Sequence, residues 1–371
     1  MVTVFDVETL LTDPATRIIV CCGSGGVGKT TTAAALGLSA AEAGRRTVVL
    51  TIDPARRLAQ SMGLSELDNV PRRVKNAGDN GGELHAMMLD MKRTFDEVVL
   101  AHTDPDRAEE IFANPFYQAM SSSFSGTQEY MAMEKLSQLR AADEWDLIIV
   151  DTPPSRSALD FLDAPQNLAR FLDGRLLKLL LAPAKTGGRG VLKVMSGTFS
   201  LFSRVITKVL GTQLLDDVST FVSALDSMFG GFRERAQRTY DLLKTPGTAF
   251  VVVAAPEPDA VREASYFADR LTGEGMPLAG LVLNRVHATE VPNLSAAASL
   301  AAAEKLGDSV TAEVLRMHAG LSRLVERERR IAAGFTTAHP DVPVVEVPAE
   351  AEDVHDLDGL RRVGAALTGG L

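Results

Sequence analysis

A glycine-rich loop between residues 23 and 31 is the first segment whose residue types could do chemistry. It matches the pattern G-x-x-x-x-G-K-[ST], directly after an apolar run at 17–23 and before an alanine-rich helical pattern. Glycines let successive backbone N–H groups point at phosphate oxygens, and the following helix N-terminus adds partial positive charge. This context favours a phosphate-binding P-loop over a chance glycine-rich turn. The predicted binding residues are Gly23, Ser24, Gly25, Gly26, Val27, Gly28, Lys29, Thr30 and Thr31.

Two side chains at the end of this loop carry the chemistry expected of an ATP site. We predict that Lys29 reaches the β- and γ-phosphates and acts in catalysis. We predict that Thr30 offers its hydroxyl to Mg²⁺. ATP and Mg²⁺ are therefore the predicted cofactors.

Two aspartates end later apolar runs, at the carboxyl edge where open α/β sheets bind their ligands. Asp151 follows its run in the manner of a Walker B carboxylate, so we predict that it binds Mg²⁺; capping the next turn is the alternative. Asp53 could likewise cap a turn at Pro54. For Asp53 we prefer a catalytic role beside the metal, orienting the attacking water, because phosphoryl transfer depends on positioning and charge.

Short apolar runs alternate with longer helical patterns along most of the chain. Continuously apolar strands separated by amphipathic helices are what a parallel sheet covered on both faces requires. We therefore predict a doubly wound, mostly parallel α/β fold. The predicted strands lie at 17–23, 47–53, 83–90, 145–151, 248–257, 278–286 and 342–348.

Two stretches interrupt this alternation, because helical spacing continues in them without an intervening strand. Apolar residues in the second stretch form single helical stripes over 168–179, 199–209 and 218–232. We predict an α-helical subdomain inserted into a P-loop ATPase domain. The ATPase domain would comprise 14–91, 144–159 and 246–371, and the helical subdomain 92–143 and 160–245.

Composition limits the classes of function. The 371 residues are 46% hydrophobic, which allows a full core, and 38 basic against 48 acidic residues give a net charge of −10. This acidic balance argues against a nucleic-acid partner. Neither a signal peptide nor an apolar run long enough to span a membrane is visible, so we expect a cytoplasmic protein. Cys21 and Cys22 are adjacent and cannot form a CxxC pair, so no zinc is expected.

These motifs together resemble the deviant-Walker ATPases, and within them the arsenical pump-driving ATPase family, which includes the targeting factor for tail-anchored membrane proteins. The resemblance covers most of the chain. Residues 51–63 and 151–165 resemble the two switches of the family. Residues 281–286 resemble its adenine-contacting Asn segment, and 347–357 resemble its late nucleotide loop. It implies that Asp53 positions the water, that Asp151 serves Mg²⁺ and that Asn284 hydrogen-bonds the adenine.

The resemblance also implies a second subunit of the same family that faces the first across the nucleotides. In the family, an early P-loop lysine reaches the partner's phosphates, and here Ser24 occupies that place. Three accounts stay open for the missing cation. In the first, which we favour, a lysine-bearing paralogue supplies the charge in a heterodimer in place of a homodimer. In the second, Arg56, Arg57 or Arg156 replaces the lysine. In the third, the chain hydrolyses ATP poorly.

In the targeting branch of the family, the helical subdomain binds a client's transmembrane helix. Stripes of Phe, Met and Leu permit that interpretation here, but amphipathic helices usually bury such stripes, so we favour core packing. The methionines in question are Met120, Met131, Met133, Met195 and Met228.

We therefore predict an ATP-hydrolysing switch whose nucleotide state controls a helical subdomain that binds a client or a membrane protein. A catalytically weak subunit that completes a paralogous ATPase is the alternative. A partitioning or positioning ATPase fits less well, because the chain is acidic and has no basic amphipathic C-terminal helix.

Overall fold

The computed structural model describes residues 3–53, 57–78, 80–114, 117–118, 121, 127–153 and 234–369. The helical stripes predicted between 168 and 232 lie outside the described residues, and so do Arg56, Arg156 and most of the segment 151–165.

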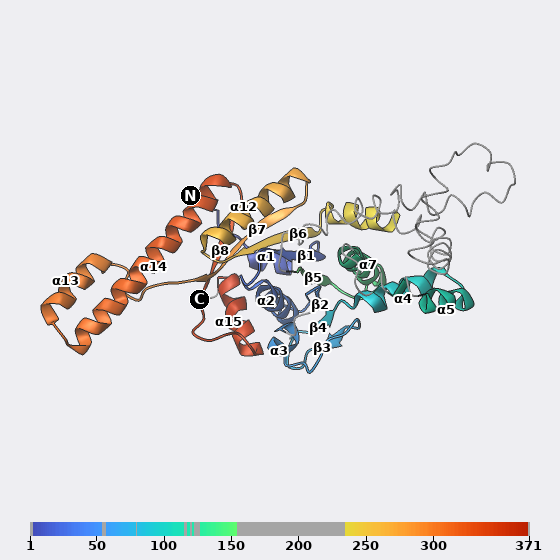
Figure 1. The fold of residues 1–371 in the computed structure, drawn as a ribbon, viewed down its shortest axis with the longest axis horizontal. Helices are drawn as coiled ribbons and strands as arrows, with labels where there is room; N and C mark the ends of the chain where they lie inside the picture. Colours follow the sequence, from blue (N-terminus) through green and yellow to red (C-terminus); the bar gives the residue numbers. More distant parts are fainter. Residues whose placement is uncertain are drawn as a thin grey trace, which may run out of the picture. The chain divides into compact units, whose positions relative to one another are not determined.

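The described chain forms one eight-stranded sheet, in the order β3-β4-β2-β5-β1-β6-β7-β8 (Figure 1). All neighbouring strands are parallel except β3 and β4, which are antiparallel. The predicted doubly wound, mostly parallel fold is therefore confirmed. The strands are β1 Ile18–Cys22, β2 Arg46–Thr51, β3 Arg72–Arg73, β4 Glu83–Met88, β5 Leu147–Asp151, β6 Thr248–Ala254, β7 Leu278–Val286 and β8 Val344–Pro348.

Each of the seven predicted apolar runs contains one of these strands. Strand β3 escaped prediction because it consists of two exposed arginines at the edge of the sheet, where no apolar signal is needed. The central strands β1, β5 and β6 are buried along their whole length, because helices cover both faces.

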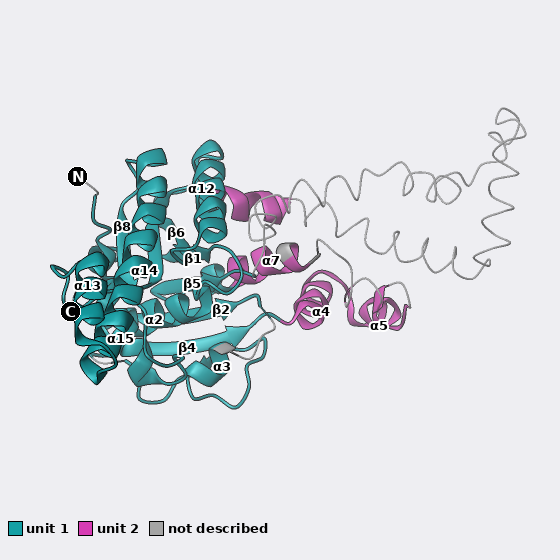
Figure 2. Cartoon of the chain, turned by 60° about the vertical axis from the view of Figure 1, so that its left-hand side comes forward, with its two compact units in different colours: residues 1–89, 139–159, 242–371 teal, residues 90–138, 160–241 magenta. Residues whose placement is uncertain are grey.

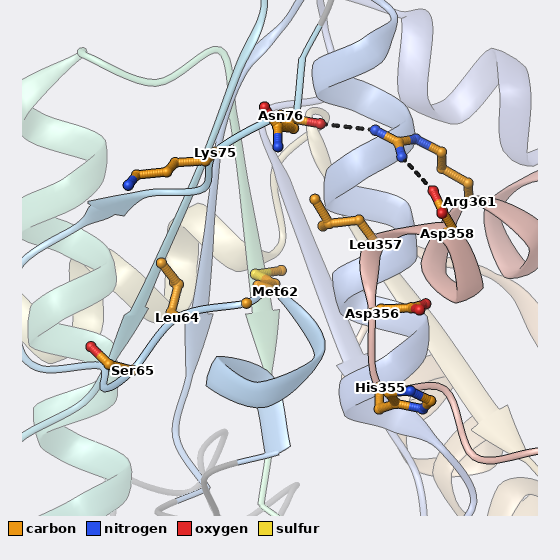
Figure 3. Close-up of a pocket in the computed structure, with 11 residues that line it drawn as sticks. Met62, Leu64, Ser65, Lys75, Asn76, His355, Asp356, Leu357, Asp358 and Arg361 are labelled. Carbon is orange, nitrogen blue, oxygen red and sulfur yellow. Dashed lines mark hydrogen bonds and ion pairs between the residues drawn. The ribbon is translucent and has the colours of Figure 1, made fainter.

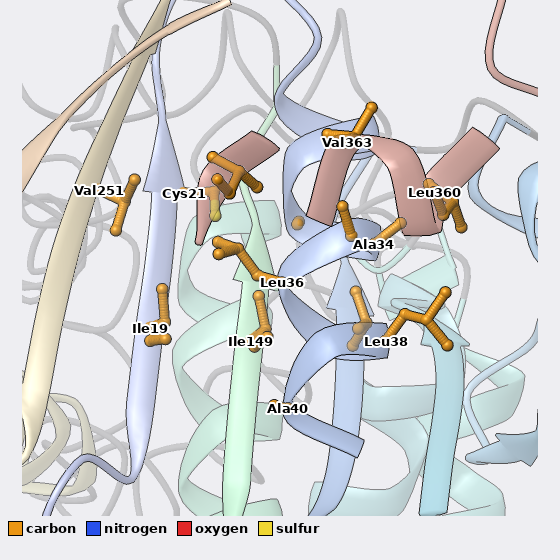
Figure 4. Close-up of a cluster of buried hydrophobic side chains, with 14 of the residues drawn as sticks. Ile19, Cys21, Ala34, Leu36, Leu38, Ala40, Ile149, Val251, Leu360 and Val363 are labelled. Atoms are coloured by element: carbon orange, nitrogen blue, oxygen red, sulfur yellow. The ribbon is translucent and has the colours of Figure 1, made fainter. Parts of the chain in front are cut away.

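The hydrophobic core on one face of the sheet lies under two helices, α2 (Lys29–Glu42) and α15 (Leu357–Leu367). In Figure 4, Leu36 of α2 lies beside Ile149, and Leu360 and Val363 of α15 belong to the same buried cluster. Gly37 lets α2 approach this closely, since a Cβ there would lie 2.6 Å from a methyl group of Val49. The P-loop helix is thus held directly on the strands that carry the site.

The first unit has three further long helices, and two of them form a hairpin between β7 and β8 (Figure 1). We predicted no separate feature for this hairpin. The helices are α12 Pro258–Gly273, α13 Ala296–Leu306 and α14 Val310–Ala338; the short helices α1 Val7–Thr12 and α3 Arg57–Ser61 complete the region.

The chain divides into two compact units, coloured separately in Figure 2. The first comprises residues 1–89, 139–159 and 242–371, and the second comprises 90–138 and 160–241. Because most of the second unit lies outside the described residues, the predicted domain boundaries stay a prediction.

The described part of the second unit is helical. It includes α4 Met91–His102, α5 Pro105–Ala113 and most of α7 Thr127–Ala142, and residues 234–241 are helical as well. Met131 and Met133 of α7 are fully buried, which favours core packing for these two methionines. Among the described residues, no helix combines the length and apolar character that crossing a membrane requires.

Candidate nucleotide-binding site

The predicted P-loop connects the buried end of β1 to the first residue of α2, as the motif requires. Two of its glycines are needed where they stand. Gly23 has φ of +153°, and a Cβ there would lie 2.1 Å from the carbonyl oxygen of Val253. Gly28 has φ of +92°, and a Cβ there would lie 2.2 Å from the amide nitrogen of Asn284. Backbone geometry and close neighbours therefore both demand glycine.

The amino group of Lys29 lies inside this loop. Its Nζ donates a hydrogen bond to the backbone oxygen of Ser24 at 2.8 Å, and the residue is only 6% exposed. Burial lowers the pKa of Lys29, and the nearby Asp151 carboxylate opposes that shift. A desolvated ammonium group held by the loop acts strongly on a phosphate because the local dielectric constant is low.

The carboxylate of Asp151 lies beneath the loop and is fully buried. Its Oδ2 accepts hydrogen bonds from the hydroxyl of Thr30 at 2.8 Å and from that of Thr51 at 2.9 Å. Burial raises the pKa of Asp151 to about 6, although both hydroxyls and Lys29 act in the opposite direction. The structure thus joins Thr30 and Asp151, two of the three predicted metal ligands.

The second oxygen of Asp151 points to a metal. Oδ1 is buried and has no hydrogen-bond partner in the described part of the chain. Buried carboxylate oxygens are normally hydrogen-bonded, so a missing partner requires an explanation. A carboxylate oxygen next to a threonine hydroxyl is the type of ligand that Mg²⁺ takes in phosphoryl-transfer sites. The residues present therefore fit the predicted ion.

Thr51 connects the two predicted aspartates, and sequence reasoning missed it. Its hydroxyl accepts a hydrogen bond from the backbone N–H of Asp53 at 3.2 Å, in addition to bonding Asp151. The parallel register of β2 and β5 sets Thr51 directly beside Asp151. Half-buried Asp53 follows at the carboxyl edge of the sheet, as predicted. Thr51 ends its strand two residues before Asp53, and this position in the sequence was the signal that could have identified it.

Asn284 lies against the P-loop. Its side-chain amide donates to the carbonyl oxygen of Val27 at 2.8 Å, and the residue is 8% exposed. The structure therefore brings Asn284 to the site, although its predicted bond to adenine stays a prediction.

Arg285 is a second residue that the sequence analysis missed. It has φ of +63°, which is unusual for a non-glycine residue, at a register shift between β7 and β8. Its guanidinium donates to the carbonyl oxygen of Gly26 at 3.0 Å. The strained backbone thus directs a cation onto the P-loop, a placement that no sequence motif signals.

A pocket lies elsewhere in the described part of the chain. It has a volume of about 760 Å³, and Met62, Lys75 and His355 are among its lining residues (Figure 3). No described P-loop residue lines it. Its arginine, Arg361, is already paired with Glu42 and Asp358. The buried carboxylate and lysine, and not this pocket, therefore mark the chemical site.

Comparison with known proteins shows the family of the chain. The model of the family described as "Anion-transporting ATPase" matches residues 16–314, which is most of the chain. The family resemblance inferred from the motifs is thereby confirmed.

Several curated relatives carry matching names. An arsenical pump-driving ATPase of Halobacterium salinarum is 30% identical over 196 residues, which cover 48% of this chain and 28% of the relative. ATPase GET3 of Malassezia globosa is 25% identical over 221 residues, which cover 57% of this chain and 64% of the relative. ATPase GET3B of Arabidopsis thaliana is 24% identical over 309 residues, which cover 76% of this chain and 67% of the relative. The matches thus span less than two thirds of the first two of these relatives.

Proposed function

Because the chain belongs to the anion-transporting ATPase family, we propose that it binds ATP with Mg²⁺ at the loop 23–31 and hydrolyses it. One observation carries this proposal. The buried carboxylate of Asp151 has one oxygen hydrogen-bonded by Thr30 and Thr51 and the other without a partner among the described residues, while Lys29 lies nearby. A buried anion of this kind is costly unless a cation joins it.

Each residue has a part in the proposed reaction. The N–H groups of the loop and the ammonium of Lys29 bind the phosphates and stabilise the charge that develops on the leaving oxygen. Thr30 and Asp151, with Asp53 nearby, would hold Mg²⁺, which neutralises phosphate charge when bound. Asp53 orients a water for attack on the γ-phosphorus, and the bond to the β–γ bridging oxygen breaks.

We propose further that hydrolysis switches the helical unit. Chain connectivity supports this, because Asp151 ends β5 only nine residues before the second unit resumes at residue 160. A change around the γ-phosphate would be carried along that short segment. On the family resemblance, the active form is a dimer, and the helical unit binds a membrane-protein client.

A second candidate follows from Ser24, which is half-buried in the loop where the family has a lysine. In this proposal the chain alone hydrolyses ATP weakly and completes a lysine-bearing paralogue. Arg285 adds an alternative source of charge within the chain, because its guanidinium already contacts the loop at Gly26.

Calorimetry and turnover measurements on the purified chain test these proposals. Mg²⁺–ATP binds the wild-type chain and binds the Lys29→Ala variant much more weakly if the site is correct. If the missing lysine limits hydrolysis, Ser24→Lys raises turnover of the chain alone by roughly tenfold or more. Absence of nucleotide binding by the wild type, with or without Mg²⁺, would refute the proposed function. Rapid wild-type turnover that Ser24→Lys leaves unchanged would refute the weak-subunit proposal.

A further inference from the structure

The first half of α14 carries an exposed apolar stripe. Val310 is 78% exposed, Val314 57%, Met317 75% and Leu324 37%, with half-buried Leu321 between the last two. The spacing of these five residues is four, three, four and three, which is the heptad spacing of a helix that packs along another helix. We call residues 310, 314, 317, 321 and 324 the α14 stripe.

In the second half of the same helix, this face is buried. Val325, Glu328 and Phe335 continue the face of the stripe and are buried, the last at 1% exposure. The opposite face is already covered in the first half, where Ala312 and Ala319 are buried and α13 runs alongside (Figure 1). The apolar face of α14 therefore extends past the sheet domain and loses its cover there.

Charges beside the stripe identify a matching partner. In heptad terms, Val314 and Leu321 are a positions, and Met317 and Leu324 are d positions. Glu313 and Arg327 lie at g positions two heptads apart, with Gly320 at the g position between them. Both flanking side chains are exposed, and neither has an ion-pair partner in the described part of the chain.

An antiparallel copy of the same helix pairs four residues of the stripe and both flanking charges at once. When Met317 packs against the partner's Leu321, Val314 meets the partner's Leu324. In that register the flanking g positions oppose each other, so Glu313 faces the partner's Arg327, and two-fold symmetry repeats the pair. A parallel pairing in register would set Met317 against itself without bringing these opposite charges together.

We propose that two copies of this chain associate through the α14 stripe, as an antiparallel helix pair with reciprocal Glu313–Arg327 ion pairs. This goes beyond the proposed function, since the pairing uses no nucleotide and no residue of the P-loop.

The second half of α14 is joined to the end of β7 by hydrogen bonds. His287 contacts Glu328 through its Nδ1 at 2.7 Å, and its backbone N–H donates to the same carboxylate at 2.9 Å. Two residues earlier, Arg285 contacts Gly26 of the P-loop. The proposed pair would therefore join two chains through a helix that is hydrogen-bonded to the strand next to the P-loop.

Reversal of the charges tests the register. Glu313→Arg alone and Arg327→Glu alone each set like charges against each other twice in a homodimer, so each variant should self-associate at least tenfold more weakly than the wild type. Mixing the two single variants creates a pair in which both contacts are again opposite in sign, so association should return. The double variant Glu313→Arg/Arg327→Glu should associate as the wild type does. Sedimentation velocity of the full chain over a concentration series measures all four cases.

Two further variants separate the stripe from the fold. Met317→Asp should abolish self-association in the absence of nucleotide and leave the melting temperature of the monomer and its nucleotide affinity unchanged. Exposed Arg330, on α14 away from the stripe, supplies the matched control, and Arg330→Asp should associate normally. A wild-type chain that stays monomeric with and without Mg²⁺–ATP overturns the proposal, as does charge reversal without effect or without rescue on mixing. In those cases the stripe has another occupant, such as a client helix, whereas loss of nucleotide binding would bear only on the proposed function.

Discussion

The P-loop follows strand β1, and the α13–α14 hairpin follows strand β7 of the same sheet. Folded proteins usually bury apolar side chains and expose charged ones, and the two regions break this rule in opposite ways. The P-loop region buries charge, with Lys29 at 6% exposure and Asp151 at 0%. The hairpin exposes apolar surface, with Val310 and Met317 more than 70% exposed. Buried charge and exposed apolar surface are the two informative exceptions in a folded protein. The first points to a charged ligand and the second to a packing partner.

The largest effect should come from the buried cation. Lys29→Ala should lower Mg²⁺–ATP turnover by roughly 10²- to 10³-fold, because the phosphates lose a charge held in a region of low dielectric constant. Lys75→Ala is the matched control, since Lys75 lines the separate pocket at the α3 side. Steady-state phosphate release measures both, and a Lys29→Ala variant with wild-type turnover would contradict the role of the loop.

The buried anion should affect stability and activity in opposite directions. Asp151→Asn should lower turnover by about 100-fold, because the metal loses a ligand. The same change should stabilise the nucleotide-free protein at neutral pH by up to about 3 kcal/mol, since burial raises the pKa of Asp151 to about 6.

Asp146→Asn is the control for that stabilisation. Burial tends to raise the pKa of Asp146, but the hydrogen bonds and charge of Arg46 lower it overall. Its replacement should therefore lower the melting temperature slightly. Thermal unfolding without nucleotide measures both variants, and an Asp151→Asn variant less stable than the wild type would contradict our assignment of a destabilising buried charge.

Gly28 of the P-loop has no room for a side chain. Gly28→Ala should cost about 1–3 kcal/mol of stability, because φ is +92° and the new Cβ would meet the side chain of Asn284 at 2.2 Å. Chemical denaturation measures the loss, and calorimetry should show weaker nucleotide binding. Unchanged binding would mean that Asn284 and the loop move apart without consequence.

The pH dependence should follow the same buried carboxylate. A raised carboxyl pKa means that the native state binds more protons than the unfolded state between about pH 4 and pH 6. The contribution of Asp151 to the stability of the nucleotide-free protein therefore rises as the pH falls through this range. Affinity for Mg²⁺–ATP should change in the other direction and fall about tenfold per pH unit below about 6, because a protonated carboxyl is a poor metal ligand. Calorimetry between about pH 5 and pH 8 measures it, and Asp151→Asn should lose most of the dependence.

The smallest effect should come from a glycine in α14. A Cβ on Gly334 would meet no atom within 4 Å. Gly334→Ala should therefore stabilise the protein by about 0.5–1 kcal/mol through helix propensity alone. Chemical denaturation measures it, and a loss of stability would show that this part of the helix packs against something more.

Much of the site could be predicted from the sequence because its signals are local. The spacing of Gly23, Gly28 and Lys29 requires one loop geometry, and an aspartate that ends an apolar run must reach the carboxyl edge of a parallel sheet. The seven apolar runs likewise became strands, since a sheet covered on both faces needs continuous apolar sequence.

Only the tertiary structure decided which distant residues meet at that edge. The register of β2 against β5 brings Thr51 to Asp151, and a bulge at the end of β7 directs Arg285 onto Gly26. Neither pairing has a sequence signature, because register and backbone strain arise from packing between segments far apart in the chain. The sequence of α14 likewise shows an apolar face along the whole helix. Only the tertiary structure shows that this face is buried in the second half and exposed in the first.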